Sequence, residues 1–232
     1  MLGIVGAFIF SACNGGEEKT EKTASTNDSA IQKTASTVDT TPSYVLVVWH
    51  KVADYAKWKK SYDGHDSVRL AFGIHNYVIG RGAEDSNMVL VATKVDDTAK
   101  AKAFGKDPSL KAAMQKGGVV GAPEITLNTM LYQDTAQNMS DLRSMTMFTV
   151  KDWDAWRKAF ESNRQVRTDN GLTDRAYGHD VGDNHKVTLV VAINDTAKAN
   201  AYWNSDLIKQ KRAESGVVGE VKRHVYRVVQ KY

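Results

Sequence analysis

Aromatic and apolar positions recur with helical spacing over residues 52–73, and the same spacing returns over residues 150–171. Trp58 and Tyr62 lie four residues apart, which places their side chains on one face of an amphipathic helix. When the chain is aligned with itself at a shift of 98 residues, no gap is needed and Trp58 meets Trp156. The pattern therefore predicts two copies of one helix, each with an aromatic face directed toward a core.

Runs rich in β-branched and aromatic residues flank each copy of this helix and predict strands. Around the first helix, the predicted strands are residues 44–52, 75–81, 88–95 and 125–132, with a second helix over residues 97–116. Asp107 and Pro108 supply an N-cap and a first-turn proline, which predicts a break inside that second helix. Around the second copy, the predicted strands are 144–150, 173–179, 186–193 and 223–229, with a second helix from residue 195. Each half has the order β-α-β-β-α-β, which is the ferredoxin-like split unit.

Each half resembles the antibiotic-biosynthesis-monooxygenase-like group of dimeric α/β barrels. The resemblance rests on the aromatic first helix, Gly73 before the second strand, the Asp-capped broken second helix, and a Gly-Val-Val-Gly turn at residues 118–121 that recurs at 216–219. It covers residues 44–232 and implies two units packed sheet to sheet. We therefore expect an α+β fold with two tandem βαββαβ ferredoxin-like repeats, residues 44–134 and 144–232, packed as an intrachain dimeric α/β barrel. The chain would then be a monomer with an internal pseudo-dimer.

The first 43 residues have a different character. Residues 1–12 are apolar but too short to span a bilayer, and Phe10-Ser11-Ala12-Cys13 resembles the lipobox of bacterial lipoproteins. The resemblance implies a signal peptide over residues 1–13, acylation of Cys13 and a lipid anchor in the outer membrane of the cell envelope, facing the periplasm or the surface. A short buried apolar segment is the alternative. Residues 14–43 hold few large apolar side chains, which predicts a disordered tether.

Composition narrows the classes of partner and cofactor. The 232 residues are 42% hydrophobic and 25% charged with a net charge of +4, and they show no Lys/Arg run with interleaved aromatics. We therefore expect a globular fold without a nucleic-acid-binding face. A single cysteine excludes disulfides within the chain and cysteine-based zinc sites. None of the six histidines recurs at the shift of 98 residues, so we expect no metal site common to both repeats and no cofactor.

Polar residues interrupt the aromatic face of each opening helix. The candidate ligand-binding residues are Trp58, Tyr62, His65 and Arg69 in the first repeat, and Trp156, Phe160, Asn163 and Arg167 in the second. A buried guanidinium needs partners. One interpretation is a pocket between helix and sheet with aromatic walls and a cation at one end, suited to an aromatic or carboxylated small molecule. The other is that both arginines pair with carboxylates of the protein and that His65 is a core histidine.

Two classes of function follow. The first is an envelope lipoprotein whose barrel binds a small molecule without catalysis. The alternative, implied by the resemblance, is a cofactor-independent monooxygenase-like enzyme, in which Asn163 with Trp156, or His65 with Trp58, would orient an aromatic substrate. The two copies differ at positions 65 and 163, so the sequence leaves catalysis and the identity of the ligand open. A role in contacts with other proteins is also left open.

Overall fold

The first half of the described chain is a βαββαβ unit preceded by a two-residue strand. The computed structural model describes residues 37–138 and 140–232, so the predicted signal peptide, Cys13 and residues 14–36 lie outside the described residues. In chain order, the elements of this half are β1 (Val38–Asp39), β2 (Ser43–Val52), α1 (Tyr55–Gly64), α2 (Asp66–Ala71), β3 (Ile74–Gly82), β4 (Met88–Val95), α3 (Thr98–Phe104), α4 (Pro108–Gly117) and β5 (Val119–Asp134).

The second half repeats this order. Its elements are β6 (Leu142–Val150), α5 (Trp153–Ser162), α6 (Arg164–Asp169), β7 (Leu172–Asp180), β8 (Asp183–Ile193), α7 (Thr196–Trp203), α8 (Asp206–Glu214) and β9 (Val217–Lys231). The glycines with positive φ also repeat, because Gly73, Gly118 and Gly121 correspond to Gly171, Gly216 and Gly219, all with φ between +67° and +75°. The predicted α+β fold of two βαββαβ repeats is therefore confirmed.

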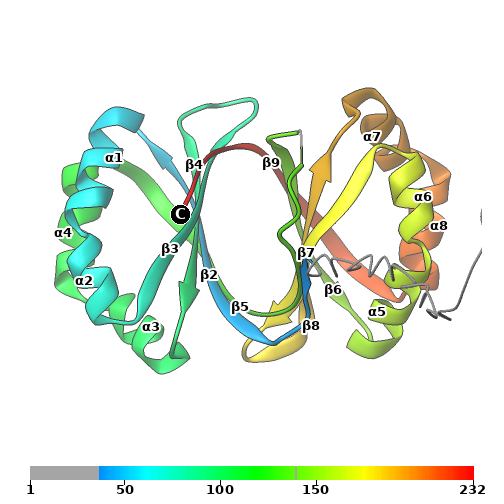
Figure 1. Cartoon of the computed structure of the whole chain (residues 1–232), viewed down its shortest axis with the longest axis horizontal. Coiled ribbons are helices and arrows are strands. Elements are labelled where there is room, and N and C mark those ends of the chain that lie inside the picture. The colour runs from blue at the N-terminus through cyan, green and yellow to red at the C-terminus, as the bar shows by residue number, and fades with distance from the viewer. Residues whose placement is uncertain (1–36, 139) are drawn as a thin grey trace, which may run out of the picture. The chain divides into compact units, whose positions relative to one another are not determined.

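Strands of both repeats form one antiparallel barrel. Within the described residues the strand order is β5-β2-β4-β3-β9-β6-β8-β7, and β7 pairs again with β5, which closes the sheet. The last strand of each repeat makes the connection. Strand β5 pairs with β2 and then with β7, and β9 pairs with β6 and then with β3. Figure 1 shows α1–α4 outside the strands of the first repeat and α5–α8 outside those of the second, so the predicted intrachain α/β barrel is confirmed.

Alternation along the strands separates the barrel interior from the layer under the helices. On β2, Val45, Val47 and Trp49 pack in a core cluster with Met130, Met145 and Tyr226, which come from both repeats. Their neighbours Leu46, Val48 and His50 point the other way, toward the helices. Each repeat therefore has a second apolar layer between its helices and its strands, and the candidate site lies in that layer.

Close contact between strands of the two repeats requires a glycine on each side. A Cβ added at Gly178 in β7 would lie 2.1 Å from the carbonyl oxygen of Thr129 in β5. At the equivalent position in β3, a Cβ at Gly80 would lie 2.3 Å from a ring carbon of Tyr226 in β9. Any larger residue would push the crossing strands apart, so these glycines permit the barrel to close.

Two predicted boundaries need correction. The last strands begin at Val119 and Val217, inside the Gly-Val-Val-Gly segments that the sequence predicted as turns, and a register shift follows within each strand. The end of the predicted disordered tether is ordered, because β1 pairs with β5 and the backbone N–H of Thr135 donates to the carbonyl of Thr37 at 2.8 Å. The end of β5 extends beyond its pairing with β2 and offers free backbone groups, which β1 satisfies.

Among residues 37–138 and 140–232, no helix has the length and apolar character that a bilayer span requires.

Candidate functional site

The predicted single helix over residues 52–73 is instead two helices, α1 and α2, which meet at His65. Its start is as predicted, since the Asp54 carboxylate accepts the Lys57 backbone N–H. Its break has a side-chain cause. The Tyr62 carbonyl accepts the guanidinium of Arg69 at 2.6 Å and the His65 backbone N–H at 3.2 Å, which interrupts the regular helical ladder.

The second repeat breaks in the same way. Helices α5 and α6 meet at Asn163, and the carbonyl of Phe160 accepts the guanidinium of Arg167 at 2.7 Å. The Asn163 side-chain amide donates to the carbonyl of Ala159, also at 2.7 Å. Each arginine therefore caps the C-terminal end of the preceding helix, and its position in the sequence determines where the helix divides.

A cavity of about 320 Å³ lies between the helices and strands of the first repeat. The four candidate residues of this repeat, Trp58, Tyr62, His65 and Arg69, all line it. Trp58 is buried and stacks on the Tyr62 ring with centroids 5.1 Å apart, so the two rings form a flat aromatic wall. The opposite wall is mainly aliphatic and includes Leu46, Val48, Ile74, Val91, Ile125 and Leu127.

His50 is the polar group that sequence reasoning missed. Its ring lines the cavity from β2, 5.6 Å from the ring of Trp58, and is 6% exposed. Within the described residues, neither of its ring nitrogens has a hydrogen-bond partner. Burial lowers the pKa of His50 to about 4, so the imidazole is neutral at pH 7 and presents one donor and one acceptor. Alternation along the strand could have indicated that His50 lies under the helices, but nothing in the sequence shows that its nitrogens lack partners among the described residues.

His65 is held by a short polar chain. Its Nε2 lies 3.0 Å from the hydroxyl oxygen of Ser109, and that hydroxyl donates to the carboxylate of Asp107, the N-cap of α4. The Ser109 oxygen therefore accepts from His65, which carries its proton on Nε2. Burial, followed by the charge of Arg69, lowers the pKa of His65. His65 is consequently a partnered residue of the wall, in contrast to His50.

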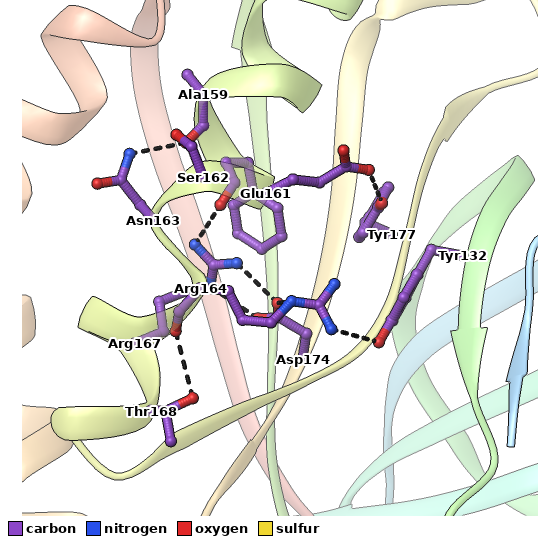
Figure 2. Close-up of polar contacts among 11 residues, drawn as sticks. Tyr132, Ala159, Glu161, Ser162, Asn163, Arg164, Arg167, Thr168, Asp174 and Tyr177 are labelled. Atoms are coloured by element: carbon purple, nitrogen blue, oxygen red, sulfur yellow. Dashed lines mark hydrogen bonds and ion pairs between the residues drawn. The ribbon is translucent and has the colours of Figure 1, made fainter. Parts of the chain in front are cut away.

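Protein groups already engage the two predicted cations. Arg167 makes two contacts of 2.7 Å to the Asp174 carboxylate (Figure 2). Its guanidinium also lies 3.4 Å above the Phe160 ring. Arg164 also approaches Asp174, at 3.6 Å, and donates to the Tyr132 hydroxyl at 3.1 Å. A fully paired guanidinium of this kind has little capacity left for a ligand carboxylate.

In the first repeat the carboxylate comes from a different element. Arg69 contacts Asp66 of α2 at 2.9 Å, and its guanidinium lies 3.7 Å above the Tyr62 ring. Asn76 occupies the position equivalent to Asp174, and its side-chain amide also donates to Asp66, at 2.6 Å. The structure therefore agrees with the second interpretation of these arginines, because each of them pairs with a carboxylate of the protein.

The second repeat has a much smaller cavity, of about 90 Å³, lined by Trp156, Phe160, Asn163 and Arg167. Substitutions to larger side chains contribute to the difference, and three of them lie in the cavity wall. Where the first cavity has His50, Gly105 and Ile125, the second has Phe148, Trp203 and Arg223, which all line its walls. The guanidinium of Arg223 lies 4.1 Å above the ring of Trp203, so these two side chains fill space that is open in the first repeat.

Within the described part of the chain, no group of three or more His, Cys, Asp or Glu side chains is placed to hold a metal ion.

Comparisons with known proteins identify the fold. No protein-family model and no curated protein matches the sequence. Among solved structures, an anthrone oxidase-like protein matches with a TM-score of 0.56 at 13% identity, over 85% of this chain and 94% of the other. A heme-binding protein from Thermus thermophilus matches with a TM-score of 0.50 at 10% identity, over 83% and 94%. A ferredoxin-fold protein related to antibiotic biosynthesis monooxygenases from Listeria monocytogenes gives 0.47 at 7% identity, over 82% and 97%. At these identities the likeness of the first two shows a shared fold.

Proposed function

We propose that this protein binds a small aromatic molecule in the first-repeat cavity and that binding without turnover is its role. The observation that carries the proposal is the buried imidazole of His50, which has no hydrogen-bond partner among the described residues and lines a mainly apolar cavity of about 320 Å³. A buried polar group without a partner costs about 1–3 kcal/mol. A ligand hydroxyl or carbonyl that hydrogen-bonds to His50 would remove that cost.

The walls of the cavity support an aromatic ligand over a carboxylated one. Trp58 and Tyr62 offer stacked aromatic surface, which favours offset or edge-on packing of another ring. His50 is neutral at pH 7, and the two terminal nitrogens of Arg69 donate to Asp66 and to the Tyr62 carbonyl, so only its buried Nε lacks a partner among the described residues. A carboxylate entering this cavity would therefore lose its hydration with only one donor of Arg69 and the water-exposed Lys102 to offset that loss, which disfavours it relative to an uncharged ring.

Two variants that introduce second-repeat residues test this proposal. His50→Phe copies Phe148 and removes the polar ring, and Gly105→Trp copies Trp203 and narrows the cavity. An added Cβ at Gly105 would make only ordinary contacts, at 3.5 Å or more, so the backbone there tolerates a side chain, as it does at Trp203. Gly64→Trp, at an exposed helix position with open space around it, is the matched control.

Binding of a panel of phenols and aromatic ketones is measured by calorimetry and by quenching of tryptophan fluorescence. We expect His50→Phe to weaken binding about tenfold, as the loss of one hydrogen bond of about 1.5 kcal/mol implies. Gly105→Trp should abolish binding, and Gly64→Trp should bind like the natural protein. Unchanged affinity in both cavity variants would exclude the first-repeat cavity as the binding site.

The second candidate function is a cofactor-independent oxidase or monooxygenase of aromatic compounds. The observation that favours it is the structural likeness to the anthrone oxidase-like protein, together with His50 and Trp58 in one cavity. This function predicts oxygen uptake with an anthrone or another phenolic substrate, lost in Trp58→Ala or Trp156→Ala. Saturable binding without oxygen uptake would exclude this second candidate and support the binding role.

The proposal also assigns a location to the protein. The apolar residues 1–12 and the lipobox-like sequence ending at Cys13 support a lipid anchor in the outer membrane, with residues 14–36 as a tether and residues 44–134 and 144–232 as the two binding repeats. Metabolic labelling with a fatty-acid analogue tests this location. We expect label and membrane association in the natural protein and neither in Cys13→Ala, and label that persists in Cys13→Ala would refute the anchor.

A further inference from the structure

The cavity of the second repeat is lined by several cations. Lys211 and Arg212 reach it from α8, Arg223 from β9 and Arg167 from α6. Two of these four charges are balanced, because Arg167 pairs with Asp174 and Lys211 lies 3.2 Å from Glu214. Within the described residues, the guanidinium groups of Arg212 and Arg223 have neither a hydrogen bond nor a carboxylate partner, and Nε of Arg223 is buried.

The fold does not require these two charges. At the equivalent positions of the first repeat, Met114 stands for Arg212 and Ile125 stands for Arg223, and the same helix and strand form there. Apolar residues at these positions would pack on the sheet without any cost of burying charge. The two arginines therefore add something that the βαββαβ unit itself does not need.

Both guanidinium groups remain charged at neutral pH although their surroundings oppose it. Burial, and then the neighbouring charge of Arg212, lowers the pKa of Arg223 to about 10. Burial also lowers the pKa of Arg212. Stacking on Trp203 orients the Arg223 guanidinium by one face and leaves its hydrogen-bond donors free in the plane. Two like charges beside one small cavity, without a carboxylate, are the arrangement that an external anion would neutralise.

We propose that the second-repeat cavity binds a small oxyanion, a carboxylate or phosphate group, between Arg212 and Arg223. The cavity volume of about 90 Å³ admits a group of this size and is far smaller than the first cavity, so the two repeats bind ligands of different chemistry. The oxyanion accepts hydrogen bonds from both guanidinium groups, and Trp203 holds Arg223 in place. This inference rests on the second repeat alone and does not depend on the ligand of the first cavity.

Titration calorimetry on the full chain tests the inference, with inorganic phosphate and acetate as separate probes at pH 7 and constant ionic strength. Arg212→Met and Arg223→Ile replace each cation by its first-repeat equivalent. Arg157→Met is the matched control, because Arg157 is an exposed arginine on α5 whose contact is Asp154, at 3.4 Å. We expect at least one probe to bind, each single cavity variant to bind it at least tenfold more weakly, and the control to bind it unchanged.

Binding of phosphate alone assigns a phosphate group to the cavity, and binding of acetate alone assigns a carboxylate. The inference is overturned if neither probe binds, or if both cavity variants bind with the affinity of the natural protein. A loss of folding is a separate outcome that circular dichroism detects. If either variant fails to fold, Arg223→Lys takes its place. This variant keeps the positive charge but loses the planar guanidinium and its paired N–H donors. Unchanged affinity in Arg223→Lys would also count against the site.

Discussion

The buried pair of Arg167 and Asp174 gives the clearest quantitative prediction. The Asp174 side chain is 2% exposed and that of Arg167 is 7% exposed, with two contacts of 2.7 Å between them. Replacing Asp174 by asparagine keeps the shape but removes the negative charge, which leaves a buried guanidinium without a counter-ion. Breaking a buried pair from one side costs about 3–5 kcal/mol. Asparagine retains one acceptor, so we expect a loss of about 3 kcal/mol in the free energy of unfolding, at the lower end of that range.

The first repeat supplies the matched control. Asp66 is the carboxylate partner of Arg69, but its side chain is 41% exposed and the pair has a single contact at 2.9 Å. Ion pairs open to water contribute about 0–1 kcal/mol. Only the Asp66 side of this pair is open to water, since the Arg69 side chain is 5% exposed. Asp66→Asn should therefore cost less than Asp174→Asn, about 1–2 kcal/mol, although it removes the same charge from the equivalent interaction.

Guanidinium chloride unfolding at pH 7, followed by tryptophan fluorescence, measures both losses. The comparison holds if the slope of unfolding free energy against denaturant is the same in all three proteins. Losses that agree within about 0.5 kcal/mol would refute the reasoning from burial. A negligible cost for Asp174→Asn would further mean that Arg167 is not committed to the fold and is free to meet a ligand.

Two further predictions concern stability. The pKa of His50 is about 4 in the folded protein against 6.5 when unfolded, so the unfolded chain takes up a proton first as the pH falls. The contribution of neutral His50 to the free energy of unfolding is therefore fully present above about pH 6.5, and it falls by up to about 3 kcal/mol as the pH falls toward 4. Urea unfolding at pH 7 and at pH 5 should show part of this loss in the natural protein and a smaller loss in His50→Phe. Gly178→Ala should destabilise the barrel by about 2 kcal/mol or more, because its Cβ would meet the carbonyl of Thr129, whereas Gly64→Ala at an open helix position should be neutral or stabilising. A thermal melt of Gly178→Ala that matches that of Gly64→Ala would contradict the close contact between the strands.

Local patterns were sufficient for the elements and insufficient for their ends. The strand predicted over residues 88–95 coincides with β4, because alternation and β-branched residues act within the strand itself. Strand β5 is longer than predicted at both ends. Its start pairs with the end of β2 and its last residues pair with β7 and β1, and local propensity reveals neither pairing. The division of the first helix at His65 was also missed, because helical periodicity continues through it and the cause is a hydrogen bond from Arg69.

The candidate site divides in a similar way. The eight predicted residues all line a cavity, because helical spacing alone determines which face of α1 or α5 meets the sheet. The spacing could not show that Asp174 would neutralise Arg167, nor that His50 would lack a partner, since these contacts join helices to strands. Arg212 and Arg223 were not predicted from the sequence because they belong to different elements, α8 and β9. Only the packing of that helix on the sheet brings both side chains to one cavity.

By itself, the sequence determined that the chain contains two βαββαβ repeats and which face of each opening helix is buried, because both follow from periodicity within short segments. The tertiary structure decided what each buried face surrounds. Cavity volume and the neutralisation of charge depend on side chains from elements far apart in the chain. The effect of having Gly105 or Trp203 at one equivalent position, and Ile125 or Arg223 at another, therefore depends on how helix and sheet pack together. One repeated plan thereby holds an apolar cavity in its first copy and a cationic one in its second.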